Sequence, residues 1–349
     1  MQALELLEHG RRDPVNEIPA IDLGGALPGN AARISTASGD LCSALYNVGF
    51  AVLHNHGIDA VLRRECFSLS AALFALPIEE KMRMVYTTTD RNRGYIANCR
   101  ESLEGTGSAG ERMALAAQVQ PDLKESFDIG SVEDTAWQDT WPGALMPAFR
   151  DQFWALRRQL DQVHAVVMRS LAIGLGVPED SFEPFFDRRE YSLRLLHYPS
   201  APAGSVSDTG QKRAGTHTDY NHLTLLLQDS VGGLQVLNAA DQWVDVRPDP
   251  EAIIVNTGDL MERWTNGLFK ATVHRVLDPV GTTSDARLCE RYSMAYFVKP
   301  NRDATIECLP VCCDARQPPK YLPVNCFEFV NAAFKKANNE SPDSESRQA

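Results

Sequence analysis

The sequence predicts a single compact unit that is mainly β with flanking helices. Between residues 192 and 298, short runs of β-forming residues follow one another closely and are separated by polar turns. Such spacing is typical of a closed antiparallel β architecture. Before this region, from residue 148 to residue 175, apolar side chains recur every three or four positions. This periodicity predicts a long amphipathic helix packed on the β structure.

The N-terminal part should alternate between helices and strands. Apolar patterns predict helices over 31–47 and 67–76, with a strand over 49–58 between them. A further helix should begin near Pro77, because proline followed by acidic residues favours a first helical turn. Residues 104–110 are polar and glycine-rich without periodicity, so this loop either covers a binding site or is simply exposed.

Seven strands are expected in the β region. One of them runs on from His217, and the other six cover 192–198, 233–237, 242–246, 252–256, 269–277 and 291–298. The chain ends in a polar, charged tail, residues 338–349, which has no apolar face and should be disordered.

The stretch 215–229 carries the clearest chemical signal. Its part after Asp219 is rich in β-formers and contains no proline or glycine, so it should form a strand, in which side chains two apart share a face. His217 and Asp219 should therefore point the same way. An imidazole and a carboxylate that converge suit a divalent first-row metal, and one more histidine would complete the ligand set of non-haem Fe(II) sites. His274 is the candidate.

A pair of residues suited to binding an acid is expected on the last strand. Arg291 and Ser293 are two positions apart and should share a face. Arginine presents a rigid fork to a carboxylate, and serine adds a hydroxyl donor. His54 and His56 have the same spacing, but no carboxylate accompanies them, so a structural role is favoured for that pair.

Three short motifs follow one another in an order specific to one family: His217-Thr218-Asp219, then His274-Arg275-Val276, then Arg291-Tyr292-Ser293. They resemble the His-x-Asp, His and Arg-x-Ser signature of the Fe(II)- and 2-oxoglutarate-dependent dioxygenases, in the isopenicillin N synthase-like branch. The resemblance implies a double-stranded β-helix, or jelly roll, that holds iron at one mouth through the two histidines and the aspartate. The segment 278–285 is longer than the family commonly shows, and a longer hairpin loop would absorb it.

The resemblance also implies an oxidoreductase that uses Fe(II) as cofactor, with 2-oxoglutarate and O2 as cosubstrates. Arg291 and Ser293 would bind the distal carboxylate of 2-oxoglutarate, and Tyr198 would be a further contact. A small organic substrate would be hydroxylated, desaturated or rearranged, in specialised metabolism, with release of succinate and CO2. Two alternatives stay open: an oxidase of the same fold that does not use 2-oxoglutarate, and a non-catalytic sensor of a small ligand.

Five candidate substrate contacts come from segments in which family members bind their substrates. They are Arg93, Tyr95, His197, Asn221 and Phe297. Arg93 could pair with a carboxylate or a phenolate, and the aromatic residues could pack on a ring. The segment Asn92-Arg93-Gly94-Tyr95 is reminiscent of the pyrimidine-oxidising members, but it is too short to name a substrate.

Composition limits the partners and the location. The net charge of −12 argues against binding to nucleic acid or to an anionic membrane. The first eight residues lack the features of a secretory signal, and no run is long enough to span a bilayer. The eight cysteines include no Cys-x-x-Cys motif, which favours reduced thiols. We therefore expect a cytoplasmic enzyme with a small-molecule substrate, whose oligomeric state stays open.

The expected division of the chain follows from these assignments. It comprises an N-terminal extension (1–16), an N-terminal region that covers the barrel (17–130), a linking helical region (131–190), the jelly-roll core (191–310), a C-terminal helical segment (311–336) and the tail (337–349).

Overall fold

The computed structural model describes residues 12–24, 31–85, 93–107, 120–131, 141–200, 212–277 and 289–337. Four predicted features lie wholly or partly outside these ranges. They are residues 1–11 of the N-terminal extension, the end of the glycine-rich loop (residues 108–110), the long segment 278–285 and the tail from residue 338.

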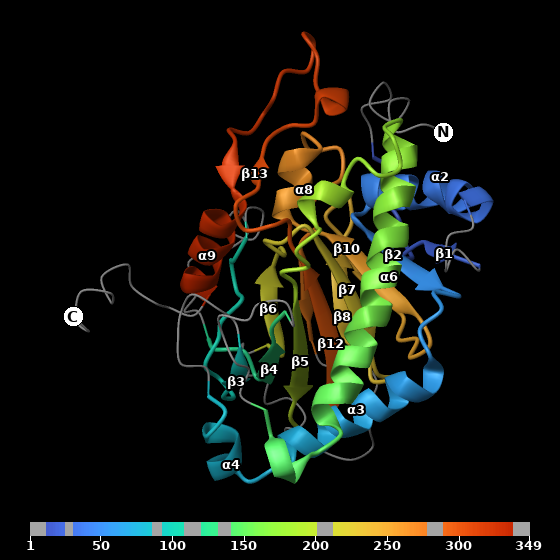
Figure 1. Cartoon of the computed structure of the whole chain (residues 1–349). Helices are drawn as coiled ribbons and strands as arrows, with labels where there is room; N and C mark the ends of the chain where they lie inside the picture. The colour runs from blue at the N-terminus through green and yellow to red at the C-terminus, as the bar shows by residue number, and fades with distance from the viewer. Residues whose placement is uncertain are drawn as a thin grey trace.

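Two β-sheets face each other and form the jelly roll (Figure 1). The larger sheet has the order β1-β2-β10-β7-β12-β5-β4-β3, and the smaller has the order β6-β11-β8-β9. The strands of the larger sheet are β1 (Ala20–Asp22), β2 (Phe50–His54), β3 (Gly94–Ile96), β4 (Glu125–Ile129), β5 (Ser192–Tyr198), β7 (Leu223–Gln228), β10 (Ile253–Thr257) and β12 (Arg291–Val298). Those of the smaller sheet are β6 (Ala214–His217), β8 (Leu234–Leu237), β9 (Trp243–Asp245) and β11 (His274–Val276).

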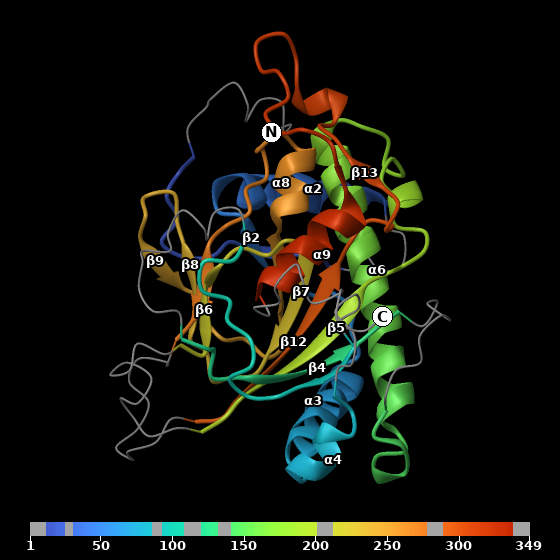
Figure 2. The same cartoon turned by 90° about the vertical axis from the view of Figure 1, so that its left-hand side faces the viewer.

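The long helix α6 (Phe149–Leu175) packs with α2 (Ala31–Asn47) and α3 (Ala60–Phe74) on the outer face of the larger sheet (Figures 1 and 2). The predicted ranges of α2 and α6 are confirmed, and Gly176 ends α6 in the left-handed conformation, with φ of 74°. The remaining elements are the helices α4 (Ile78–Met82), α8 (Asp259–Trp264) and α9 (Cys326–Ala337), the short strands β13 (Thr305–Ile306) and β14 (Val324–Asn325), and 3-10 turns at Gly143–Leu145, Glu183–Phe185 and Pro310–Cys312.

Three predicted element boundaries were wrong, each for a local reason. The helix α3 begins before residue 67, because Asp59 caps it and accepts hydrogen bonds from the backbone N–H groups of Val61 and Leu62 at 2.7 and 2.9 Å. The strand expected over 49–58 ends at His54. The following residue, Asn55, has a φ of 51°, which takes the chain out of the extended conformation.

The strand expected over 269–277 is reduced to β11. The backbone N–H of Phe269 donates to Thr265 Oγ1 at 3.1 Å, and that of Ala271 donates to Glu262 Oε2 at 2.8 Å. These donors are therefore bound to the α8 region instead of a neighbouring strand. Most of the other predicted strands agree with the structure, and β5 and β12 match to the residue.

Apolar side chains fill two separate regions of the fold. One cluster lies between the larger sheet and the helices α2, α3 and α6. A second cluster, which includes Leu196, Val236 and Ala295, lies between the two sheets. Figure 2 shows the corresponding layers, with the smaller sheet, the larger sheet and α6 following one another across the molecule. In the described part of the chain, no helix has both the length and the apolar character needed to cross a membrane.

Candidate active site

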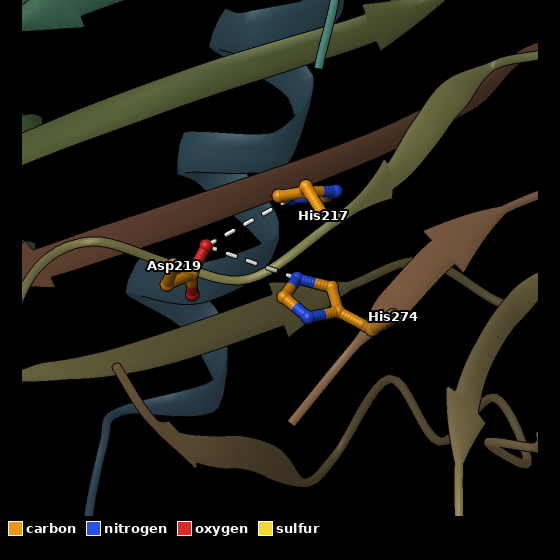
Figure 3. A group of neighbouring side chains, drawn as sticks. All are labelled: His217, Asp219 and His274. Carbon is orange, nitrogen blue, oxygen red and sulfur yellow. Dashed lines mark ion pairs between the residues drawn. The ribbon is translucent and has the colours of Figure 1, made fainter. Parts of the chain in front are cut away.

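His217, Asp219 and His274 meet between the two sheets. One possible ligand atom from each lies within 4.8 Å of the others, and all three residues are buried. The Nε2 atoms of His217 and His274 are each 3.8 Å from Asp219 Oδ1 (Figure 3). The two histidines are direct partners in the antiparallel pairing of β6 with β11. Because these positions are 57 residues apart in the numbering (274 − 217), their meeting depends on sheet register.

The expected single strand through Asp219 is broken. The strand β6 ends at His217, and β7 begins only at Leu223. Asp219 therefore lies in the connection between two sheets, where its backbone oxygen accepts a hydrogen bond from the N–H of Asp259 at 2.8 Å. The side chains still converge as predicted, although strand alternation is not the reason.

Backbone carbonyl groups fix the orientation of both imidazoles. His217 Nδ1 lies 2.7 Å from the carbonyl oxygen of Gly215, and His274 Nδ1 lies 3.0 Å from that of Thr272. An Nδ1–H that donates to a carbonyl leaves the Nε2 lone pair free, which is the usual arrangement of a metal-binding histidine. Both free lone pairs are on the nitrogen atoms nearest Asp219.

The carboxylate of Asp219 is held in the same way. Its Oδ2 accepts hydrogen bonds from Thr224 Oγ1 at 2.6 Å and from Asn256 Nδ2 at 2.8 Å. Both donors belong to the larger sheet, on β7 and β10. With Oδ2 bound by two donors, Oδ1 is the oxygen left to face the histidines.

The protonation states of His217 and Asp219 at neutral pH suit a metal site. Burial, reinforced by the neighbouring His274, lowers the pKa of His217 to about 3. Burial opposes the ionisation of Asp219, but the two imidazoles and the hydrogen bonds from Asn256 and Thr224 outweigh it and lower the pKa of the carboxyl group. A neutral imidazole and an ionised carboxylate are the forms that bind a metal ion.

Arg291 and Ser293 lie deeper between the sheets, next to Tyr198. Arg291 is 1% exposed, and its Nη1 donates to Ser293 Oγ at 3.1 Å. Its guanidinium carbon is 4.9 Å from the centre of the Tyr198 ring. The Nε atom has no hydrogen-bond partner, and no carboxylate forms an ion pair with this arginine within the described part of the chain. A buried cation of this kind fits an anionic ligand, because an uncompensated buried charge is costly.

One cavity joins these two groups. Its lining includes the residues of both groups, together with Phe50, Leu226 and Leu234 as apolar walls. We name it the inner cavity. It therefore offers a set of metal-ligand atoms and a buried arginine in one enclosed, largely apolar space.

Three of the predicted substrate contacts are not brought to the inner cavity. His197 lies between Leu196 and Tyr198, which line the cavity, so it faces the opposite side of β5. Its Nδ1 is 2.7 Å from Glu125 Oε1. Tyr95 donates a hydrogen bond to the same carboxylate, and Lys81 Nζ is 2.8 Å from it. His197 and Tyr95 thus belong to a buried polar cluster outside the inner cavity.

Arg93 is also absent from the inner cavity and lines a different one with Gly130, Ser131 and Lys299. Asn221 and Phe297 do line the inner cavity. The amide of Asn221 donates to the carbonyl of Leu223 at 2.8 Å and to Thr224 Oγ1 at 3.0 Å. Asn221 therefore holds the threonine that binds Asp219, whereas Phe297 contributes a ring to the cavity wall.

Sequence reasoning missed a buried charge network at the edge of the inner cavity. Arg194 donates to both carboxylate oxygens of Asp128 at 2.7 Å and to those of Glu101 at 3.1 Å. Lys124 is 3.5 Å from Glu101 and 3.1 Å from Asp122. Arg194 and Lys124 both line the cavity. The phase of β5 could have revealed Arg194, because it lies four positions before Tyr198 on the same face.

The described part of the glycine-rich loop lies against β6. The N–H of Gly105 donates to the carbonyl of Thr216 at 2.8 Å, and the N–H of Thr218 donates to the carbonyl of Thr106 at 3.2 Å. Gly107 has a φ of 78°, and a Cβ there would lie 2.0 Å from Thr218 Oγ1. Leu103 of the same segment lines the inner cavity, so residues 101–107 form part of its wall.

A jelly roll whose facing sheets bring two histidines and an aspartate together defines a class of non-haem iron oxygenases. Residues 189–300 match the model of the 2OG-Fe(II) oxygenase superfamily. Residues 18–148 match the model described as the N-terminal region of non-haem dioxygenases in morphine synthesis.

Similar proteins agree with this assignment. The chain is 33% identical over 313 residues to the 2-oxoglutarate-dependent dioxygenase frbA of a Dothideomycetidae species, covering 87% of this chain and 92% of that protein. It is 34% identical over 309 residues to the 2-oxoglutarate-Fe(II) type oxidoreductase hxnY of Emericella nidulans, covering 84% and 82% of the two chains. The crystal structure of a full-length Neurospora crassa protein in complex with alpha-KG and thymine superposes with a TM-score of 0.81 at 35% identity, over 91% of this chain and 96% of that one.

The chain therefore belongs to the 2OG-Fe(II) oxygenase superfamily. It is a 2-oxoglutarate-dependent dioxygenase that acts on a small molecule, with Fe(II) as cofactor and 2-oxoglutarate and O2 as cosubstrates.

Proposed function

We propose that His217, Asp219 and His274 bind the catalytic Fe(II). The observation that carries this assignment is the orientation of the three donors. Each histidine is fixed through Nδ1 with its Nε2 free, and Asp219 is fixed through Oδ2 with its Oδ1 free. Bound iron would supply the redox chemistry that couples the oxidation of 2-oxoglutarate to that of a C–H bond. The chain supplies the position of the ion and excludes water from it.

Arg291, Ser293 and Tyr198 are proposed to bind 2-oxoglutarate. The guanidinium would pair with the distal carboxylate, and the Ser293 hydroxyl would add one hydrogen bond. The burial of Arg291 without a carboxylate partner among the described residues supports this role. It also favours 2-oxoglutarate use over an oxidase reaction, in which the same arginine would have to hold the substrate.

The substrate is proposed to occupy the remainder of the inner cavity, where Phe297 and Arg194 line the wall. Phe297 offers a surface for an apolar or aromatic group, and Arg194 lies 6.0 Å from its ring centre. The similar Neurospora crassa protein was crystallised with thymine, and the names of several relatives support a role in specialised metabolism. We propose a small organic substrate that is hydroxylated, desaturated or rearranged there.

The cellular compartment and the classes of partner are proposed from the composition of the chain and the state of its thiols. A net charge of −12 disfavours nucleic acid and anionic membranes as partners. All eight cysteines are free, as in a reducing compartment. A cytoplasmic enzyme without a nucleic-acid or membrane partner is the proposal that these features support.

The decisive experiment measures iron binding and succinate release together. Purified protein is loaded with Fe(II) under anaerobic conditions, and succinate formation from 2-oxoglutarate is then followed across a panel of small molecules. Mass spectrometry identifies the oxidised product of whichever compound stimulates it. Asp219→Ala should lose iron and all substrate-dependent succinate, and its circular dichroism should stay close to that of the wild type.

A matched control is available on the smaller sheet. Asp245 is an exposed aspartate of β9 whose Oδ1 accepts a hydrogen bond from Gln235. Asp245→Ala should bind iron and release succinate like the wild type. Full iron occupancy in Asp219→Ala would contradict the ligand assignment, and turnover without any 2-oxo acid would establish the oxidase alternative.

A further inference from the structure

A second cavity lies beside the inner one, where β4, β5 and β12 meet the C-terminal helix. The strands contribute Gly130, Ser192 and Lys299 from positions at or just past their ends. The helix α9, drawn in red in Figure 2, contributes an apolar wall that includes Phe334. We name this space the outer cavity.

The outer cavity continues the face of the sheet that lines the inner cavity. Ser192 of the outer cavity is the direct register partner of Phe297, which lines the inner cavity. Lys299 follows Phe297 by two positions, and Ser192 precedes Arg194 by two, so each pair shares a face. Two residues of a strand span about 7 Å. Lys299 therefore lies only about 7 Å beyond Phe297 along the sheet, within reach of a ligand that extends past Phe297.

The outer cavity is basic, although the protein is strongly acidic overall. Arg93, Lys299 and Arg302 line it, and Glu190 is the carboxylate among its lining residues. Glu190 is already bound by Arg302, whose backbone N–H donates to it at 2.7 Å and whose Nε lies 3.6 Å from it. Among the described residues that line the cavity, three cations therefore stand against one carboxylate, in a chain of net charge −12.

Lys299 is the cation with the least compensation. Within the described ranges its ammonium group has no hydrogen bond and no ion pair. Burial lowers the pKa of Lys299 and outweighs the opposing effects of Cys326, Asp128 and Glu190. A bound anion would offset this cost, because it would give the half-buried ammonium group a charge-assisted hydrogen bond.

We propose that the outer cavity binds an anionic group, a carboxylate, of the substrate through Lys299, while the carbon to be oxidised lies in the inner cavity. This inference rests on the proposed function and adds the substrate class. The substrate would be an acid with an apolar or aromatic middle, which packs against Phe297 and the α9 wall. Arg93, which also lines the outer cavity, would add to the positive field around the carboxylate.

The test uses benzoate and benzamide, which share a ring and differ in charge. The protein is first saturated with Mn(II) and 2-oxoglutarate, so that the Arg291 site is filled, and binding is measured by calorimetry or ligand-observed NMR. Benzoate should bind the wild type, and Lys299→Met should weaken it by about 10-fold to 100-fold, the range of a charge-assisted hydrogen bond. Lys299→Arg should restore most of the affinity. Benzamide should bind weakly to all of these proteins.

Lys270→Met is the matched control, because Lys270 is exposed and does not line the outer cavity. It should bind benzoate like the wild type. Equal affinity of Lys299→Met and wild type, equal affinity for benzamide and benzoate, or no benzoate binding at millimolar concentration would each overturn the proposal. So would a second equivalent of 2-oxoglutarate that is lost in Lys299→Met, since the cavity would then be a cosubstrate site. These binding readouts need no turnover, so failure of the proposed catalytic reaction would be seen separately.

Discussion

Asn256 offers the sharpest test of how the site is built, because it touches the carboxylate of Asp219, a proposed metal ligand, without being a ligand itself. Its Nδ2 donates to Asp219 Oδ2 at 2.8 Å, beside the 2.6 Å hydrogen bond from Thr224. Asn256→Leu keeps a similar volume and removes the donor. Oδ2 would then be held by Thr224 alone, so it could compete with Oδ1 for the ion and the carboxylate could rotate more easily.

The expected loss follows from the geometry. A hydrogen bond to a buried charged group contributes about 1.5–3 kcal/mol. Each tenfold change in affinity corresponds to about 1.4 kcal/mol of binding free energy. Asn256→Leu should therefore weaken Fe(II) or Mn(II) binding by about 10-fold to 100-fold, the range found for outer partners of metal ligands. Anaerobic titration against a chelator of known affinity measures this change, with thermal unfolding of the metal-free protein measured in parallel.

Asn301 supplies a matched control far from the site. It is 6% exposed, and its Nδ2 donates to Oδ1 of the exposed Asp187 at 2.7 Å, so Asn301→Leu also removes an amide-to-carboxylate hydrogen bond, one that is partly buried. This variant should lose stability and keep its metal affinity. Unchanged metal affinity in Asn256→Leu, or an equal loss in both variants, would refute the argument that Asn256 orients Asp219.

Three further predictions concern the cosubstrate and the cavity wall. Arg291→Gln should weaken 2-oxoglutarate binding by roughly thirty-fold to a few thousand-fold, because breaking a buried charged pair costs about 2–5 kcal/mol of binding free energy. Ser293→Ala should cost only about 1–3 kcal/mol of the same free energy. Anaerobic titration of 2-oxoglutarate and of the substrate separately measures both affinities, and a larger effect on the substrate would contradict the assignment. Residues 93–107 should gain protection from hydrogen exchange when the substrate binds, and unchanged protection would count against a covering role. Gly107→Ala should lower the free energy that holds this segment in place by about 1–3 kcal/mol, because Gly107 has a positive φ and lies against Thr218. Gly39→Ala in α2 is the control and should be tolerated, because no atom lies within 4 Å of the added Cβ.

The sequence was sufficient to predict the class of fold and the family, because both depend on short-range patterns, and the roles proposed for the site residues remain predictions. Alternation and turns located β5 and β12 to the residue, and the 3.6-residue periodicity located α6. The order of three short motifs indicated the family, to which the chain does belong. The domain boundaries assigned from sequence remain a prediction.

Strand alternation in β5 also predicts which side of the sheet each of its residues faces. Tyr198 was expected inside the barrel, so its neighbour His197 had to face outward, where the structure places it against Glu125. The same argument would have placed Arg194 inside, four positions before Tyr198. Both differences arose from assigning residues by segment instead of by face.

Only the tertiary structure decided what surrounds the essential residues. Asn256 reaches Asp219 across 37 positions, and Arg194 reaches Glu101 across 93, and no local pattern relates residues so far apart. Sheet register sets these contacts, and register depends on which strands become neighbours when the two sheets pack. The sequence therefore determined which groups could carry the chemistry, while the packing of the sheets determined which oxygen of Asp219 faces the histidines, that Arg291 has no carboxylate partner among the described residues, and where the two cavities lie.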